Sequence, residues 1–335
     1  MTDQQDPRPL GRLRLMRLLS GRATFPASLL LAIATLCWAG NFIVGRAMHA
    51  EIPPVTLTFW RWVVAGAVLL PFAAPSAWRL RTELCRHWGL LLMLAATGVV
   101  LFHLFVYTGL QTTSAVNAAL MLATTPVLIP GISLLLGHEV LTRRQGLGIM
   151  VSLLGVALIV LRGDPNLIAS LSLNPGDLWL LLAVPTWAFY SVLLRRLPSN
   201  LPRLTILFAI VAIGVALLVP LYALELAYMG TVAVTAGIVF AIGYVALFAS
   251  VLAYICWNQA VMQVGANKAG LFLHLMPVFA TALAIALLGE AVRGYHAVGV
   301  AFIAIGIYLT TSRHRGWFRA EKEARDRPLP PDTGR

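Results

Sequence analysis

Residues 204–222 read LTILFAIVAIGVALLVPLY, a run of apolar side chains without a single charged residue. About 20 such residues form a helix long enough to cross the roughly 30 Å hydrocarbon core of a bilayer. Comparable runs recur along the whole chain, near residues 27–47, 55–74, 88–109, 115–136, 146–162, 178–196, 234–256, 267–288 and 294–312. The sequence therefore predicts an all-α membrane protein with ten transmembrane helices.

The composition excludes the main alternatives to this class. Of the 335 residues, 59% are hydrophobic and 11% are charged, and the mean hydropathy is +0.83. A soluble domain carries roughly 25% charged residues, so this chain lacks the charge for a soluble enzyme or a disordered protein. An outer-membrane barrel is also excluded, because its strands alternate apolar and polar residues in segments of about 10.

The distribution of basic residues predicts the orientation of the helices. The chain has 25 Lys and Arg against 13 Asp and Glu, a net charge of +12. With the N-terminus inside, 21 basic residues fall in the tails and inner loops, whereas the outer loops hold three, Arg46, Arg162 and Arg293. The positive-inside rule then places both termini in the cytoplasm of a bacterial inner membrane. The basic residues favour contact with anionic lipids at the cytoplasmic face rather than with nucleic acid.

The cysteines give no indication of a bound metal. Cys37, Cys85 and Cys256 form no C-x-x-C motif and no cluster with histidine. The sequence therefore predicts neither a disulfide framework nor a zinc site. We expect no metal, no cofactor and a monomeric protein.

An internal repeat divides the membrane region into two halves. Residues of the same type recur at offsets of 149 to 151 positions: Trp38 with Trp187, Pro71 with Pro220, Asn117 with Asn267, Pro126 with Pro277, Glu139 with Glu290, and Gly148 and Gly155 with Gly299 and Gly306. Because each half has five helices, an odd number, the second half enters the membrane in the opposite orientation. Substrate sites of such inverted repeats lie near the midplane, where the halves meet.

The repeat also sets the predicted boundaries of the chain. A basic cytoplasmic N-tail at 1–26 precedes the first five-helix repeat at 27–162. A periplasmic linker at 163–176 leads to the second repeat at 177–312, and a disordered cytoplasmic C-tail follows at 313–335.

Several short motifs resemble the drug/metabolite transporter superfamily, in its ten-helix EamA-type branch. They are Trp38-Ala39-Gly40-Asn41-Phe42, Phe59-Trp60-Arg61, Pro126 with Gly137-His138-Glu139, and Pro277 with Leu288-Gly289-Glu290. The resemblance implies transport, with amino acids and related small metabolites, or other polar solutes, as cargo. Arg61 is a departure from the internal symmetry, because Ile210 occupies its equivalent position.

Polar and aromatic residues inside the spans are the candidates for the substrate pathway: Trp38, Asn41, Arg61, Asn117, Thr124, Trp187, Tyr190 and His274. An amide or imidazole at this depth must face protein or water. The alternative for each residue is a packing contact between helices. For Arg61 the choice lies between docking a substrate carboxylate and snorkelling or capping a neighbouring helix.

Two prolines and two ion pairs complete the candidates. Pro126 and Pro277 are expected to kink the fourth and ninth helices, because proline removes a helical hydrogen bond. Glu139 with Arg143 and Glu290 with Arg293 are spaced for structural ion pairs or caps at helix ends. A proton antiporter built on a central buried carboxylate is not supported, since no acid lies in the middle of a span.

These observations predict a secondary transporter that exports amino acids or related small metabolites by alternating access. One alternative is a membrane-embedded enzyme, for which the sequence offers no G-x-S-x-G or H-E-x-x-H motif. A carrier for drug-like cations, sugars or nucleotide precursors is another, and a scaffolding protein is a third. A primary pump is excluded by the lack of a P-loop motif.

Overall fold

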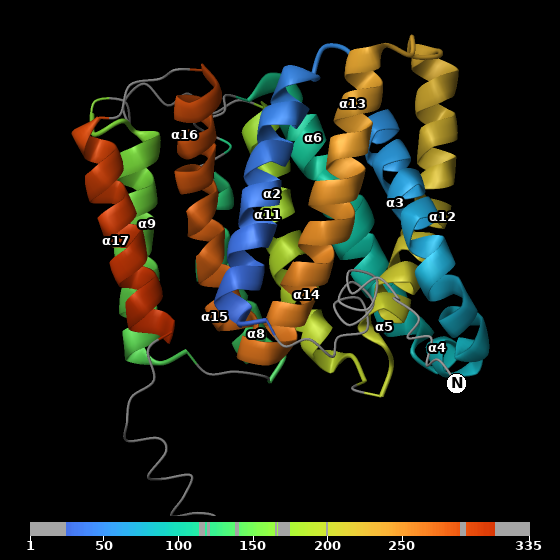
Figure 1. The fold of residues 1–335 in the computed structure, drawn as a ribbon, viewed down its shortest axis with the longest axis horizontal. Helices are drawn as coiled ribbons and strands as arrows, with labels where there is room; N and C mark the ends of the chain where they lie inside the picture. The colour runs from blue at the N-terminus through green and yellow to red at the C-terminus, as the bar shows by residue number, and fades with distance from the viewer. Residues whose placement is uncertain are drawn as a thin grey trace, which may run out of the picture.

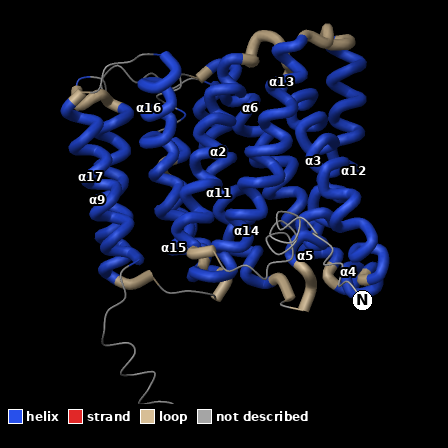
Figure 2. Tube along the Cα trace, in the orientation of Figure 1, coloured by secondary structure: helices blue, strands red, loops and turns tan. Residues whose placement is uncertain are grey.

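The computed structural model describes residues 25–113, 118, 121–137, 141–164, 166, 175–198, 200–288 and 293–311. All regular structure in these ranges is helical (Figure 2). This finding confirms the predicted all-α fold class. Eight helices in the described chain are long and apolar enough to cross a membrane, and a shorter apolar helix accompanies them. The fourth and ninth predicted spans are the two outside this set of eight, so the arrangement is consistent with ten crossings.

The helices run up and down in a single bundle (Figure 1). The first half contains α2 (Ala27–Ala47), α3 (Pro54–Arg79), α4 (Arg81–Arg86), α5 (Trp88–Ala95), η1 (Ala96–Leu101), α6 (Phe102–Thr112), α8 (Thr125–Leu135) and α9 (Arg143–Val160). The second half contains α11 (Pro175–Leu193), η2 (Leu194–Arg196), α12 (Arg203–Met229), α13 (Ala236–Tyr244), η3 (Val245–Leu252), α14 (Ala253–Val264), α15 (Ala266–Leu271), η4 (Phe272–His274), α16 (Leu275–Leu288) and α17 (Gly294–Thr311).

Helices α3 and α12, equivalent elements of the two halves, pack side by side at one edge of the bundle (Figure 1). The Glu225 carboxylate of α12 accepts hydrogen bonds from the amides of Val55 and Thr56, at 3.0 and 2.6 Å. These amides belong to the first turn of α3, where helical N–H groups have no partner within the helix. The ring of Tyr222 stacks on Phe59 with centroids 4.4 Å apart. Glu225 therefore caps a helix of the other half.

Helices α9 and α17 form a second equivalent pair at the opposite edge of the bundle (Figure 1). A Cβ added at Gly155 would lie 2.6 Å from the Gly299 carbonyl oxygen, and one added at Gly148 would lie 2.7 Å from that of Gly306. Only glycine permits backbones to approach so closely. The four glycines Gly148, Gly155, Gly299 and Gly306 thus allow the close packing of α9 and α17.

The third and eighth spans each contain a segment of π-helix, η1 and η3, which begin 149 residues apart. A π-helical turn leaves main-chain groups without their usual α-helical partners, so other groups must bond them. The Tyr254 hydroxyl donates to the Gly98 carbonyl in η1, and Trp38 Nε1 donates to the Ala249 carbonyl in η3 at 3.0 Å. Each half thus supplies a side chain that bonds the π-helical segment of the other.

The fourth and ninth spans are interrupted near their prolines. A turn at Ala123 and Thr124 precedes α8, and Pro126 lies in the first turn of that helix. In the ninth span the 3₁₀ segment η4 separates α15 from α16, and Pro277 lies in the first turn of α16. Proline is well tolerated there, because the first turn of a helix needs no N–H from it. Both prolines therefore follow a break in the helix.

Candidate functional site

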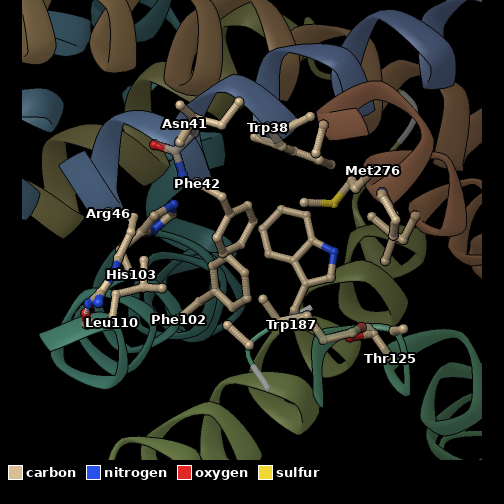
Figure 3. Close-up of a pocket in the computed structure, with 18 of the residues that line it drawn as sticks. Trp38, Asn41, Phe42, Arg46, Phe102, His103, Leu110, Thr125, Trp187 and Met276 are labelled. Atoms are coloured by element: carbon tan, nitrogen blue, oxygen red, sulfur yellow. Dashed lines mark hydrogen bonds between the residues drawn. The ribbon is translucent and has the colours of Figure 1, made fainter. Parts of the chain in front are cut away.

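A cavity of about 470 Å³ lies between the two halves of the bundle. Helices α2 and α6 and the start of α8 provide the wall from the first half, while α11 and the η4–α16 segment provide the wall from the second. Figure 3 shows Phe42, Phe102 and Trp187 around the centre of the cavity. The volume is within the roughly 300–1,000 Å³ that is usual for pockets that bind small molecules.

One wall of the cavity consists of consecutive turns of α2. Trp38, Asn41, Phe42 and Arg46 of this helix all line it. Eight residues separate Trp38 from Arg46, which corresponds to a rise of about 12 Å along the helix. The cavity thus extends from the middle of α2 to its last turn, where the α2–α3 connection begins (Figure 1).

Trp38 and Trp187, which line the cavity, belong to an aromatic cluster that consists of Trp38, Trp187, Tyr254 and Trp257. Trp38 lies edge to face against Trp187, with ring centroids 5.0 Å apart, and 5.3 Å from Trp257. Trp187 and Trp257 are 5.7 Å apart, and Tyr254 contacts both Trp38 and Trp187. All four side chains are buried. The cluster joins α2 and α11 to α14, and so links the two halves.

Arg61 lies immediately behind the cavity wall and is fully buried. Its Nε donates to Ser250 Oγ at 2.8 Å, and its Nη1 donates to Tyr107 Oη at 2.6 Å and to Asn41 Oδ1 at 3.3 Å. Its Nη2 has no hydrogen-bond partner among the described residues. The guanidinium is therefore a buried positive charge bonded to three neutral side chains.

Asn41 connects this buried arginine to the cavity. Its Oδ1 accepts from Arg61 and also from the Tyr107 hydroxyl, at 2.7 Å. A guanidinium only donates hydrogen bonds, so the amide oxygen, and not the nitrogen, must face Arg61. The orientation of the Asn41 amide follows from this chemistry, and its N–H groups remain available on the cavity side.

Of the residues proposed from sequence, Trp38, Asn41, Trp187 and Pro277 line the cavity. Arg61 contacts it only through Asn41, as described above. Asn117 lies outside the described residues, as do Glu139 and Glu290, so the ion pairs expected with Arg143 and Arg293 fall outside them as well.

His274, Thr124 and Tyr190 are not among the residues that line the cavity. His274 is fully buried and bridges Ser152 Oγ, at 2.7 Å from Nδ1, and the Ala123 carbonyl, at 2.9 Å from Nε2. Thr124 donates to the Met121 carbonyl at 2.6 Å. Tyr190 donates to Asn258 Oδ1 at 2.9 Å. In this conformation the hydrogen bonds of His274 and Tyr190 join structural elements to one another, and that of Thr124 stays within its own turn.

Several residues that line the cavity were not proposed from sequence, and Phe42, Arg46 and Phe102 are among them. Arg46 had been counted only as a charge of the first outer loop. Its Nη1 donates to the Leu110 carbonyl at 2.8 Å, which holds the side chain against α6. Phe42 and Arg46 are four residues apart on α2, a spacing that places them on one face and was a usable signal.

Comparison with known proteins agrees with this architecture. A profile of the EamA-like transporter family matches residues 25–161 and 174–312. The "Uncharacterized transporter YyaM" of Bacillus subtilis (strain 168) is 30% identical over 274 residues, which cover 81% of this chain and 88% of the relative. The "Uncharacterized inner membrane transporter YedA" of Escherichia coli (strain K12) is 27% identical over 287 residues, with coverage of 82% and 87%. A solved crystal structure superposes with a TM-score of 0.68 at 21% identity, covering 85% of this chain and 96% of the other.

Proposed function

The chain belongs to the EamA-like transporter family, a family of membrane transporters, and from that premise we propose that it exports amino acids or related small metabolites. In this proposal the protein is a secondary transporter of the bacterial inner membrane, with both termini in the cytoplasm. It works by alternating access around a site between its two inverted repeats.

The cavity is the single observation that carries the proposal. It lies between the halves, and each half contributes an aromatic side chain to it from an equivalent position, Trp38 and Trp187. A site in this place becomes accessible from either side when the halves rock against each other. The aromatic walls suit the apolar part of a metabolite, while Asn41 and Arg46 suit its polar part.

The aromatic cluster supports alternating access in particular. It lies at the end of the cavity opposite to Arg46, and its side chains come from both halves. We assign the cluster as the closed inner gate of an outward-facing state. In the inward-facing state the rings of Trp38 and Trp187 separate, and the walls near Arg46 approach each other.

Counterflow in proteoliposomes tests the proposal. The purified protein is reconstituted with a panel of unlabelled amino acids and small carboxylic acids inside, and entry of the same labelled compound is measured. We expect accumulation above that of protein-free liposomes for at least one compound, and a loss in Trp38→Ala. The matched control is Trp78→Ala, because Trp78 is 72% exposed at the end of α3, far from the cavity. Equal counterflow by Trp38→Ala and the wild type would contradict the site.

A further inference from the structure

The charged side chain among the residues that line the cavity is an arginine. Arg46 lines it, and Arg61 lies one side chain behind it. In the complete sequence, none of the ten predicted spans contains an aspartate or glutamate, and the 13 acidic residues all lie outside these spans. A buried charge is usually compensated by a nearby charge of opposite sign. Among the described residues, the hydrogen-bond partners of Arg61 are neutral, and the buried carboxylate of Asp177 in α11 is bonded to Thr113.

Asn41 and Arg46, which both line the cavity, offer hydrogen-bond donors to it. The Asn41 amide oxygen is already occupied by Arg61 and Tyr107, so Asn41 offers its N–H groups. Arg46 uses Nη1 for the Leu110 carbonyl, and a guanidinium has five N–H donors in total. Figure 3 shows Asn41 and Arg46 on the same side of the cavity. A ligand group on that side is therefore met by donors and positive charge.

The other side of the cavity is apolar and aromatic. Trp187 and Met276 lie there in Figure 3, opposite to Arg46. Phe42 and Phe102 lie between the two sides. The cavity thus combines one donor-rich positive end with an apolar body, and a ligand that fills it has the complementary arrangement.

We infer that the cargo is an organic anion, a carboxylate without a compensating ammonium group, attached to an apolar or aromatic body. The inference rests on the proposed transport function and narrows its cargo. The carboxylate lies at the Asn41–Arg46 end, where charge-assisted hydrogen bonds to it are strong. The body lies between Phe102 and Trp187. An ammonium group gains no carboxylate partner here and is placed near two arginines, so cations bind poorly and amino acids bind less tightly than the corresponding acids.

Three compounds with the same aromatic body test the charge preference directly. They are 3-phenylpropionate, L-phenylalanine, which adds the ammonium group, and phenethylamine, which retains the ammonium group and lacks the carboxylate. Binding to purified wild-type protein in detergent is measured by quenching of tryptophan fluorescence. We expect 3-phenylpropionate to bind most tightly, and at least about tenfold more tightly than phenethylamine, since one charged contact contributes about that factor. The inference is overturned if either ammonium compound binds more tightly than 3-phenylpropionate, or if none of the three compounds binds.

The position of the carboxylate is tested with arginine variants. Arg46→Gln should weaken the binding of 3-phenylpropionate about tenfold, whereas Arg46→Lys should keep part of the affinity because the charge remains. The matched control is Arg79→Gln, which removes the same charge from an exposed position at the far end of α3 and should leave affinity unchanged. Equal weakening in Arg46→Gln and Arg79→Gln overturns the assignment.

Counterflow with the same three compounds separates this inference from the proposed function. Counterflow of L-phenylalanine in preference to 3-phenylpropionate refutes the anion preference and leaves the transporter intact. If the three compounds bind in the expected order but none shows counterflow, the result supports the anion site and removes support for transport.

Discussion

Trp38 and Trp187 meet edge to face between the two halves, with ring centroids 5.0 Å apart and planes at 85°. They occupy equivalent positions in the repeats, 149 residues apart. Their surroundings nevertheless differ. Trp38 Nε1 donates to the Ala249 carbonyl in η3 at 3.0 Å, whereas Trp187 Nε1 has no hydrogen-bond partner among the described residues. The pair is symmetric in position and asymmetric in bonding.

This asymmetry predicts different effects of the same substitution. Trp38→Phe leaves the Ala249 carbonyl without its partner and should lower the free energy of unfolding by about 1–3 kcal/mol. Trp187→Phe removes no such hydrogen bond, so it should lower the free energy of unfolding by less. Thermal melting of both variants in the same detergent makes the comparison. A larger loss in Trp187→Phe would show that Ala249 is not an important anchor.

Asn41→Asp separates stability from cargo binding. The new carboxylate lies beside the buried Arg61 and forms an ion pair, so the melting temperature should rise or stay unchanged. The negative charge next to the cavity should at the same time reduce binding of 3-phenylpropionate at least about tenfold. Melting and fluorescence quenching are measured on the same preparation. Undiminished binding of the anion by the folded variant would contradict the role given to Asn41.

The glycine contacts between α9 and α17 predict a strong effect of one methyl group. In Gly155→Ala the new Cβ would meet the Gly299 carbonyl oxygen, so the helices must separate, at a cost of about 1–3 kcal/mol. Gly131→Ala is the control, because no atom lies within 4 Å of a Cβ at this position of α8. The control should be neutral or stabilising, since alanine favours helix over glycine. Similar melting temperatures for the two variants would refute the close packing.

The native cysteines report the orientation of the protein. Cys85 in α4 is exposed, whereas Cys37 and Cys256 are buried. If both termini are cytoplasmic, a membrane-impermeant maleimide should label Cys85 only after the cells have been permeabilised. Thr231→Cys provides the opposite case, because Thr231 is exposed in the α12–α13 connection at the other end of the bundle (Figure 1). Labelling of Cys85 in intact cells would reverse the topology.

The sequence was sufficient for the fold, because length and apolarity alone identify a membrane span. The ends of the helices could be predicted less well from the sequence. Helix α12 continues to Met229, beyond the predicted end at 222, because the hydrophobic run determines the buried part and not where the helix stops. The π-helical segment η1 also left no signal, since nearly every residue around it is apolar and shows no periodicity.

Only part of the candidate site could be predicted from the sequence. Trp38, Asn41 and Trp187 were proposed for the cavity and line it. For Arg61 the expectation was docking of a substrate carboxylate, snorkelling to the outer surface or capping of a neighbouring helix, and the structure places it behind the wall, bonded to Ser250 and Tyr107. Which way a side chain points depends on the neighbouring helices, and Ser250 is 189 residues away in the chain. No pattern local to α3 contains that information.

The cap that Glu225 provides imposes an order on the biosynthesis of the protein. The ribosome makes Val55, in the first turn of α3, 170 residues before it reaches this carboxylate. Until α12 has been inserted, the amides of Val55 and Thr56 depend on water or lipid head groups for their hydrogen bonds. The first repeat produced alone would therefore keep an unfinished helix end at the membrane surface. Co-expression of the second repeat supplies the missing carboxylate from a separate polypeptide.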